Sequence, residues 1–167
     1  FMLEYNGELV SAERRDRVAQ LLMYIGGSGG VGKSRVIAAA VHLFTAYGRK
    51  HWLRLCAYTA FAAGQIGGTT THALMGEITQ KKRKRDVTYN PSAKTMTTLQ
   101  RVWSEARLCI VDECSMLSCH WNGLLSARMQ AARSGISDAP YGGVHMIFCG
   151  DFTQLPPIST TGRPLYT

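Results

Sequence analysis

A glycine-rich segment between an apolar run and a helical pattern constrains this chain more than any other feature. The segment, Gly27-Ser-Gly-Gly-Val-Gly-Lys33-Ser34, fits the Walker A spacing of Gly, four residues and Gly-Lys-Ser. It follows a predicted strand over residues 21–25 and opens a predicted helix over residues 33–47. Glycines let successive backbone N–H groups converge on phosphates, and the helix N-terminus adds the positive end of its dipole. The segment therefore predicts a phosphate-binding loop between a strand and a helix.

The residues of this loop have distinct expected tasks. Lys33 can reach the β- and γ-phosphates of a nucleotide, and the Ser34 hydroxyl can bind Mg²⁺. The expected cofactors are therefore ATP and Mg²⁺. The residues expected to surround the phosphates ahead of Lys33 are Gly27, Ser28, Gly29, Gly30, Val31 and Gly32.

Short apolar runs alternate with helical patterns along the rest of the chain. Strands are predicted over residues 52–58, 108–111 and 144–149, a short helix after residues 64–71, and longer helices over residues 93–107 and 116–133. Gly48 stands where the C-terminal glycine of the first helix belongs. This alternation is typical of an α/β domain, so the expected fold has three layers with a mainly parallel central sheet.

Two adjacent carboxylates, Asp112 and Glu113, follow the third predicted strand. They suit a Walker B segment, in which Asp112 holds Mg²⁺ and Glu113 orients or deprotonates the attacking water. A helix start is the alternative, because negative charge is favourable there, and taken alone the pair fits both interpretations about equally. The Walker A segment upstream favours the Walker B interpretation.

The last predicted strand leads into the polar loop Gly150-Asp-Phe-Thr-Gln154-Leu-Pro-Pro157. A parallel sheet places its carboxyl strand ends at one edge, where ligands of open α/β sheets bind. Gln154 is therefore a candidate for sensing the γ-phosphate, and the prolines would stiffen its loop. A proline-rich surface turn is the alternative interpretation.

The net charge of +8 and the isoelectric point near 9.5 indicate a polyanionic partner. Five of these charges form one run, Lys81–Arg85, inside a polar insertion loop at about residues 80–91. The run fits a solvated loop, a nuclear import signal or a contact to the backbone of a nucleic acid. No apolar run reaches the roughly 18 residues that span a bilayer, so no membrane partner is expected.

The five cysteines indicate structural thiols of an intracellular protein. They are an odd number, and no pair has the Cys-x-x-Cys spacing of a zinc or redox motif. Cys114, Cys119 and His120 lack a fourth ligand at suitable spacing, so no metal cluster is expected there. Phe44, Trp103 and Trp121 stand at helical core spacing and are interpreted as core residues.

Taken together, these segments resemble the motifs of the petite-integration-frequency (PIF) helicases and of the related Helitron transposon helicases. The Walker A segment resembles motif I, Asp112-Glu-Cys-Ser-Met116 resembles motif II, and the loop from Gly150 to Pro157 resembles motif III. Residues 57–63 and 67–72 resemble motifs Ia and Ib. The resemblance covers about residues 21–166 and implies a RecA-like P-loop NTPase domain.

The resemblance also implies an activity and its residues. It implies ATP-driven translocation along single-stranded DNA from 5′ to 3′, with unwinding at duplex junctions, in DNA repair, recombination and telomere maintenance. By motif match, the ATPase roles fall to Lys33, Ser34, Asp112, Glu113 and Gln154. Thr59 and His72 become candidates for contact with the DNA. The expected location is the nucleus, with the mitochondrion as the alternative.

Residues 1–167 are expected to be a single RecA-like domain of a longer parent, because nothing after motif III resembles a second motor domain. Alone, this domain is not expected to unwind DNA. Two alternatives remain open, namely a P-loop kinase or other phosphotransferase, and a truncated module that holds ATP or DNA without turnover. The ATPase rate with and without single-stranded DNA separates the three interpretations.

Overall fold

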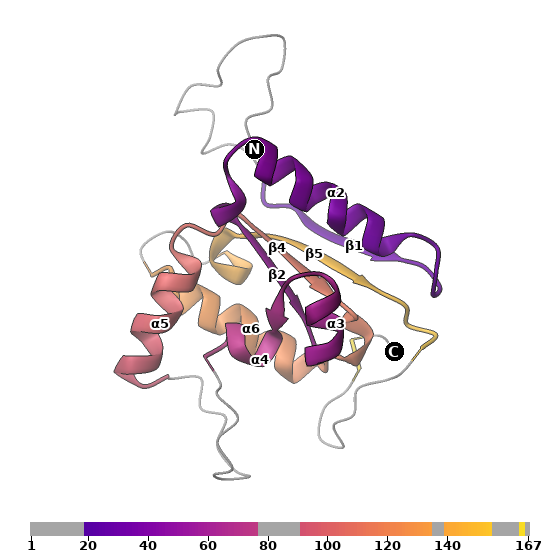
Figure 1. Cartoon of the computed structure of the whole chain (residues 1–167). Coiled ribbons are helices and arrows are strands. Elements are labelled where there is room, and N and C mark those ends of the chain that lie inside the picture. The colour runs from indigo at the N-terminus through magenta and orange to yellow at the C-terminus, as the bar shows by residue number, and fades with distance from the viewer. Residues whose placement is uncertain (1–18, 77–90, 135–138, 155–163, 166–167) are drawn as a thin grey trace.

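A five-stranded parallel sheet forms the centre of the molecule (Figure 1). The computed structural model describes residues 19–76, 91–134, 139–154 and 164–165. The strand order is β1-β5-β4-β2-β3, which confirms the predicted mainly parallel α/β fold. In that order the strands span Leu22–Gly26, His145–Gly150, Leu108–Asp112, Leu53–Ala57 and Thr69–Thr70.

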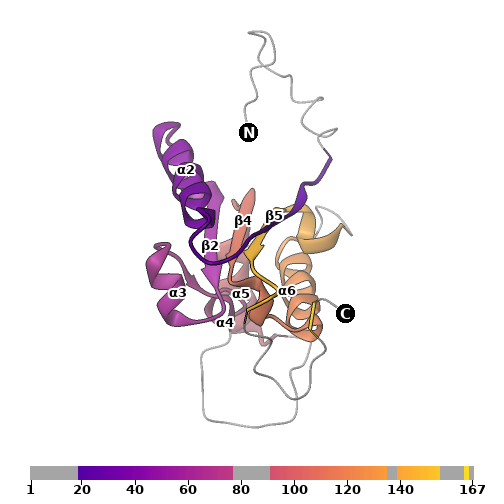
Figure 2. The same ribbon diagram turned by 90° about the vertical axis from the view of Figure 1, so that its right-hand side faces the viewer.

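Helices cover both faces of this sheet, which gives the three predicted layers (Figure 2). Helices α2 (Lys33–Ala46) and α3 (Ala60–Gln65) lie on one face. Helices α5 (Ala93–Trp103) and α6 (Cys119–Ala132) lie on the other. The short helix α4 spans Thr71–Leu74. None of the described helices is both long and apolar enough to cross a membrane.

The C-terminus of α2 has the glycine-dependent cap that the sequence predicts. Gly48 has a φ of +64°, in the left-handed region that favours glycine. Its N–H donates to Thr45 O at 3.0 Å, and the N–H of Arg49 donates to Phe44 O at 2.7 Å. This pair of bonds is a Schellman motif, which satisfies free carbonyls of the last turn and directs the chain toward β2.

A buried arginine joins the layer of α5 and α6 to the sheet. The Arg133 side chain donates to the carbonyl oxygens of Trp103, Ser104, Ala106 and Gly142 at 2.7 to 3.2 Å. Burial lowers the pKa of Arg133 because it disfavours the charged form. The four carbonyl partners offset part of that cost, and they fix the end of α5, the start of β4 and the 3₁₀ turn at Pro140–Gly143.

Several predicted boundaries differ from the structure. The helix predicted over residues 93–107 ends at Trp103, and the helix predicted over residues 116–133 begins at Cys119 because Ser118 is its N-cap. Trp52 belongs to a 3₁₀ turn, Lys50–Trp52, and not to β2. Helix α3 and the two-residue strand β3 were not predicted. Short elements of this kind depend on packing against the sheet, which local sequence does not report.

The predicted core residues are mostly buried. Phe44 and Trp103 are buried as expected, whereas Trp121 is only partly buried against the core. On helix α2 the side chain of Val36 is 47% exposed. The buried stripe of α2 runs from Ile37 to Phe44, and Val36 lies one position outside it.

The five cysteines are free thiols. Cys119 is exposed, and the buried thiols, as expected for small core residues, are Cys56, Cys109, Cys114 and Cys149. The basic run Lys81–Arg85 lies outside the described residues.

Candidate nucleotide-binding site

The phosphate loop lies between the end of β1 and the start of α2, as the sequence predicts. Gly30 and Gly32 have φ values of +82° and +101°, which residues with a Cβ rarely adopt. Gly32 is the N-cap of α2 and contributes no side-chain hydrogen bond to the helix N-terminus. The N–H groups of Lys33 and Ser34, the first two of α2, therefore remain available to an anion, whereas the Arg35 N–H donates to Gly32 O at 2.9 Å.

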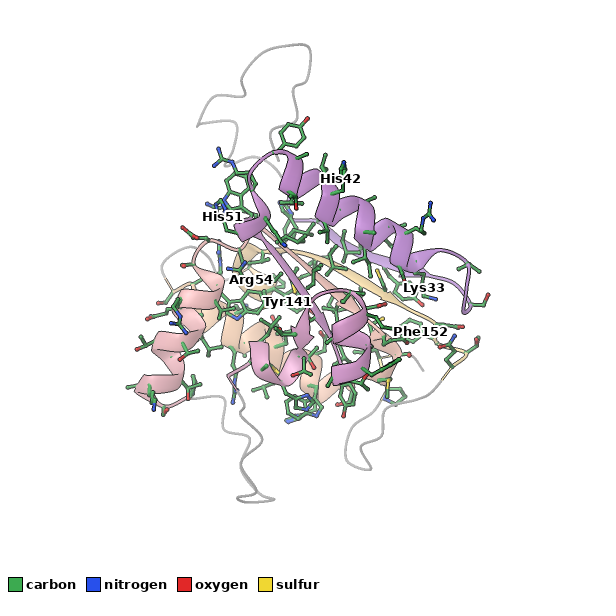
Figure 3. All side chains as sticks on the ribbon, in the orientation of Figure 1. Lys33, His42, His51, Arg54, Tyr141 and Phe152 are labelled. Atoms are coloured by element: carbon green, nitrogen blue, oxygen red, sulfur yellow. The ribbon has the colours of Figure 1, made fainter. Side chains whose placement is uncertain are left out.

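The Lys33 side chain folds back over this loop (Figure 3). Its Nζ donates to Gly27 O and, at 3.0 Å, to Ser28 O. The ammonium group thus lies above the same backbone that is predicted to surround the phosphates. Ser34 follows in the first turn of α2 and is exposed.

The two predicted acids lie at the same edge of the sheet, at the end of β4. Asp112 is buried, and its Oδ1 accepts a hydrogen bond from the Glu113 N–H at 3.0 Å. Glu113 has a φ of +53°, an uncommon conformation for a residue other than glycine. This sharp turn of the chain directs the two neighbouring carboxylates differently, with Asp112 inside and Glu113 partly exposed.

The Glu113 carboxyl group has a raised pKa. Burial is the largest cause, and the negative charge of Asp112 adds to it. The positive charge of Lys33 acts in the opposite direction, so the phosphate loop and Glu113 influence each other electrostatically. A carboxylate with raised proton affinity is better suited to accept a proton from water.

The end of β5 connects the loop of β1 to the acids of β4. The Gly27 N–H donates to Gly150 O at 3.3 Å, which joins the phosphate loop to β5. On the other side, a Cβ at Gly150 would approach Cys114 Sγ to 2.9 Å, so this close contact requires glycine. Burial raises the pKa of Cys114 to about 12, which keeps this thiol protonated and inert.

Gln154 lies close to the phosphate loop, as the strand-end argument predicts. Its Nε2 lies 3.4 Å from the position that a Cβ on Gly29 would occupy. The turn that carries it is fixed by Asp151, whose Oδ1 accepts bonds from the Thr153 N–H at 2.9 Å and hydroxyl at 2.6 Å. The hydrogen bonds from Thr153 are the main reason that the pKa of Asp151 is lowered.

Sequence reasoning did not assign roles to Asp151, Tyr24 or Phe152. The rings of Tyr24 and Phe152 stack with their centroids 4.8 Å apart, and the Tyr24 hydroxyl donates to Gly150 O at 3.2 Å. They pin the start of the Gln154 loop to β1. An acid directly after a strand was a usable signal for Asp151, but pairing between distant aromatic residues leaves no trace in one sequence.

The two candidate DNA-contact residues lie beyond the acids at the same edge. The Thr59 hydroxyl caps α3 by accepting the Ala62 N–H at 3.2 Å. The His72 ring lies 5.4 Å from the ring of Tyr58 and 4.5 Å from that of Trp121. Since Tyr58 precedes Thr59, the fold brings motifs Ia and Ib together, and Trp121 joins them although it was interpreted only as a core residue.

Along the edge, the order is therefore phosphate loop, Gln154 turn, paired acids and then the threonine–histidine region. A phosphate-binding loop after one strand, together with paired acids at the end of another strand on the same edge of a parallel sheet, defines the P-loop ATPase class. The sequence profile of the family described as "PIF1-like helicase" matches residues 11–165. The chain belongs to the PIF1-like helicase family.

Individual relatives agree with this assignment. The chain is 36% identical over 134 residues to the ATP-dependent DNA helicase PIF1 of Saccharomyces cerevisiae, covering 80% of this chain and 15% of the yeast protein. It is 31% identical over 147 residues to human PIF1, covering 85% of this chain and 21% of the human protein. The chain thus spans only a small part of the curated relatives it matches.

Solved structures show the same domain architecture. The Pif1 helicase of Candida albicans superimposes with a TM-score of 0.67 at 28% identity, over 91% of this chain and 34% of that one. The Bacteroides Pif1 helicase in complex with ADP-AlF3 and single-stranded DNA gives a TM-score of 0.65 at 25% identity, over 89% and 32% of the two chains.

Proposed function

We propose that this chain is the ATP-binding RecA-like domain of an ATP-dependent DNA helicase. The observation that carries the proposal is the arrangement of Lys33, Gln154 and the Asp112–Glu113 pair at one edge of a parallel sheet, in a chain of the PIF1-like family. ATP hydrolysis there drives movement along single-stranded DNA from 5′ to 3′ in the full-length parent, and unwinding at duplex junctions. Its biological setting is DNA repair, recombination and telomere maintenance.

The nucleotide phosphates bind in the loop between β1 and α2. Backbone N–H groups of the loop and of the first turn of α2 donate to the phosphate oxygens. The Lys33 ammonium exchanges its two carbonyl partners for the β- and γ-phosphates, because an anion is the stronger acceptor. Bound phosphate therefore replaces contacts that already hold the lysine over the loop.

The residues around the loop also fit Mg²⁺. Ser34 offers a hydroxyl and Asp112 a carboxylate, and Mg²⁺ is bound in proteins through a few oxygen ligands together with substrate phosphates. The Ser34 hydroxyl and the Asp112 carboxylate would hold Mg²⁺, which when bound would supply positive charge to offset the charge that develops on the phosphates. Asp112 keeps its orientation through the bond that its Oδ1 accepts from the Glu113 N–H.

Glu113 acts on the attacking water. Its raised pKa and partial exposure suit a group that accepts a proton from a water molecule in line with the γ-phosphate. Gln154 approaches the phosphate loop from the turn that follows β5, and it senses the γ-phosphate through its side-chain amide. Its turn is tied to β5 through Asp151, so loss of the γ-phosphate is transmitted to the sheet edge.

Thr59 and His72 contact the DNA strand at the same edge. The Thr59 hydroxyl still has a proton to donate to a phosphate while it accepts the capping bond. The His72 imidazole, held between Tyr58 and Trp121, can approach a phosphate or a base. The structure of Bacteroides Pif1 with ADP-AlF3 and single-stranded DNA supports a single-stranded DNA partner for this family.

The deciding experiment is the steady-state ATPase rate of the full-length parent with and without single-stranded DNA. A DNA motor hydrolyses ATP faster when the strand is present. A P-loop kinase would be indifferent to DNA and would transfer phosphate to a small acceptor. A binding module would retain ATP without releasing phosphate, and either of these results would refute the proposal.

We also infer that the parent works in a compartment that holds DNA, the nucleus or the mitochondrion. Replacing Lys81–Arg85 by serines tests the part played by the basic run. Exclusion of the variant from nuclei would support an import signal. A salt dependence of single-strand binding that is less steep, by up to about 3.5 in the log–log slope for five contacts, would support a DNA contact instead.

A further inference from the structure

The edge of the sheet opposite the phosphate loop is basic. In Figure 3, Lys33 and Phe152 lie at one end of the molecule, and His51 and Arg54 lie at the other. The 3₁₀ turn Lys50–Trp52 directly precedes β2, and Arg107 directly precedes β4, the parallel neighbour of β2. The Arg107 N–H donates to Trp52 O at 2.8 Å, so the two strand starts are held together by their backbones.

One tryptophan organises the cationic side chains of this edge. The guanidinium carbon of Arg49 lies 4.8 Å from the ring centre of Trp52, and that of Arg107 lies 6.0 Å from it. Both distances are in the cation–π range. The His51 ring packs edge-on at 5.9 Å. We call Arg49, Lys50, His51, Trp52 and Arg107 the Trp52 patch; Trp52 is half-buried and the other four are exposed.

The arginines at this edge fall into two kinds. Arg54 and Arg133 use their guanidinium groups on main-chain carbonyls, with bonds of 2.9 Å to Val102 O and 2.7 Å to Trp103 O. By contrast, the side chains of Arg49 and Arg107 form no hydrogen bond or ion pair with any residue that the structure describes, and only the indole orients them. Their N–H donors are therefore free for a ligand.

Among the described residues, few acids lie near the patch. Burial is the main cause of the lowered pKa values of His145 and Arg133, and the charge of Arg107 lowers both further. Most of the acids that the structure describes, namely Asp112, Glu113 and Asp151, lie at the opposite, phosphate-loop edge. The exception is Glu105, whose charge acts on the structural arginine Arg54. The described part of the chain is thus electrically polarised along its strands.

We propose that the Trp52 patch is a second nucleic-acid surface, which binds the phosphate backbone of duplex DNA away from the nucleotide edge. A guanidinium stacked on an indole presents its N–H groups around its rim, where they match two oxygens of a phosphate. Rigid backbone bonds hold two such groups and a lysine within one small area. The inference rests on the proposed function, because it takes the polyanion to be the DNA on which the parent acts.

The test measures the salt dependence of binding by the full-length parent to a blunt DNA duplex, with nucleotide absent. Each duplex phosphate contact contributes about −0.9 to the slope of log affinity against log salt. The double variant Arg49→Ser, Arg107→Ser should therefore have a slope less negative by about 1.8. Its loss of affinity between about 50 and 200 mM salt should be about tenfold smaller than that of the wild type.

Two matched controls isolate the patch. The variant Arg49→Lys, Arg107→Lys keeps both charges and should keep the wild-type slope. Lys94→Ser removes an exposed cation from the first turn of α5 and should change the slope less than Lys50→Ser does. Unfolding midpoints of all variants show whether the fold is retained, and ATPase at saturating single-stranded DNA should stay at the wild-type level.

The outcomes separate this inference from the proposed function. If the serine variant keeps the wild-type slope while DNA still stimulates ATP hydrolysis, the patch proposal is wrong and the motor proposal stands. If the wild type shows no DNA-stimulated hydrolysis, the motor proposal itself fails. In a third outcome, the serine variant keeps the wild-type DNA slope and loses binding to polyglutamate. That result would assign the patch to an acidic protein partner and would also overturn the inference.

Discussion

The two faces of the sheet are packed very differently. On the face covered by α5 and α6, seventeen buried residues form one cluster that includes Leu99, Trp103 and Leu124. On the face covered by α2, the corresponding cluster has six buried residues, among them Ile37 and Phe44. The phosphate loop follows β1, an edge strand of the sheet in which Leu22 is 51% exposed and Tyr24 is 46% exposed.

This difference indicates a division of labour within the described part of the chain. The face with α5 and α6 holds the larger buried apolar cluster, so we expect it to contribute more to the folding stability. The phosphate loop, α2 and β1 have few buried contacts, and such regions open with lower free energies than the core. The residues that must adapt to the nucleotide therefore lie in the weakly packed part of the chain. Strands β4 and β5 connect them to the strongly packed part.

The largest expected effect comes from removing the rest of the parent. Residues 1–167 alone should hydrolyse ATP about 10³ to 10⁵ times more slowly than the parent with DNA, which is the usual contribution of an arginine finger. No arginine lies in the described part of the loops that follow β1, β4 and β5, and Arg35 lies beyond the first of these loops, in the first turn of α2. Side-by-side ATPase and strand-separation assays measure the effect. Near-parental DNA-stimulated hydrolysis by the short chain would mean that its catalytic set is complete.

The next largest effect is expected at the phosphate edge itself. Glu113→Gln should lower turnover by about 10² to 10⁴, because general-base assistance is lost, while nucleotide affinity is retained. Lys33→Ala should lose both turnover and affinity, because Lys33 holds the phosphates. Nucleotide binding and single-turnover hydrolysis in the parent distinguish the two. Wild-type turnover by the glutamine variant would remove Glu113 from the role of base.

The raised pKa of Glu113 gives a pH signature for the same site. The base must be ionised, so turnover should fall as pH drops through this raised pKa, and the residual rate of Glu113→Gln should lack that limb. Ionisation of Glu113 has the opposite effect on the stability of the fold. Above the raised pKa the ionised carboxylate disfavours the folded state, so the glutamine variant should be at least as stable as the wild type at neutral pH. That advantage should vanish below the ordinary pKa of a glutamate, which urea unfolding across pH can measure.

A pair of aromatic truncations compares the buried core with the exposed edge strand β1. Trp103→Ala should lower the free energy of unfolding by about 3 to 5 kcal/mol, because it empties a fully buried site on the α5 and α6 side. Tyr24→Ala should cost about 1 kcal/mol, the value of an exposed aromatic pair, but should disturb ATPase through the Gln154 turn. Urea unfolding of both variants measures the two losses in the free energy of unfolding. Equal losses would show that the exposed strand β1 contributes as much stability as the buried core.

The same division explains what could be predicted from the sequence. The phosphate loop, Asp112, Glu113 and the carboxyl-edge location of Gln154 follow from local spacing and from the rule that parallel strands share an edge. The left-handed conformation of Glu113 and the Trp52 patch could not be predicted in this way. They depend on contacts between segments far apart in the chain, such as Arg107 with Trp52. The role of Arg133 is similar, because a charge near a helix end is usually solvated and here it is buried on carbonyls.

The smallest expected effect compares two helix caps, one on each face. Ser118 is buried and its hydroxyl accepts the Trp121 N–H at 3.3 Å, whereas the partly exposed Thr59 accepts the Ala62 N–H at 3.2 Å. Loss of an N-cap costs about 0.5 to 2 kcal/mol. The cost of Ser118→Ala should lie near the upper end of this range, because the backbone N–H that loses its partner has little access to water. The cost of Thr59→Ala should lie near the lower end.

The effects of the two cap substitutions should differ further when DNA binding is measured. Thr59→Ala should weaken single-strand affinity, because it removes a hydroxyl that can donate to a phosphate, and Thr59→Ser should restore both the cap and the affinity. Ser118→Ala should change stability but leave DNA affinity unchanged, because its hydroxyl is enclosed on the face of α6. Anisotropy titrations beside urea unfolding give both values for each variant. If Thr59→Ala kept wild-type DNA affinity while losing the capping energy, the threonine would be a helix cap alone, and the DNA contact at this end of the edge would rest on His72.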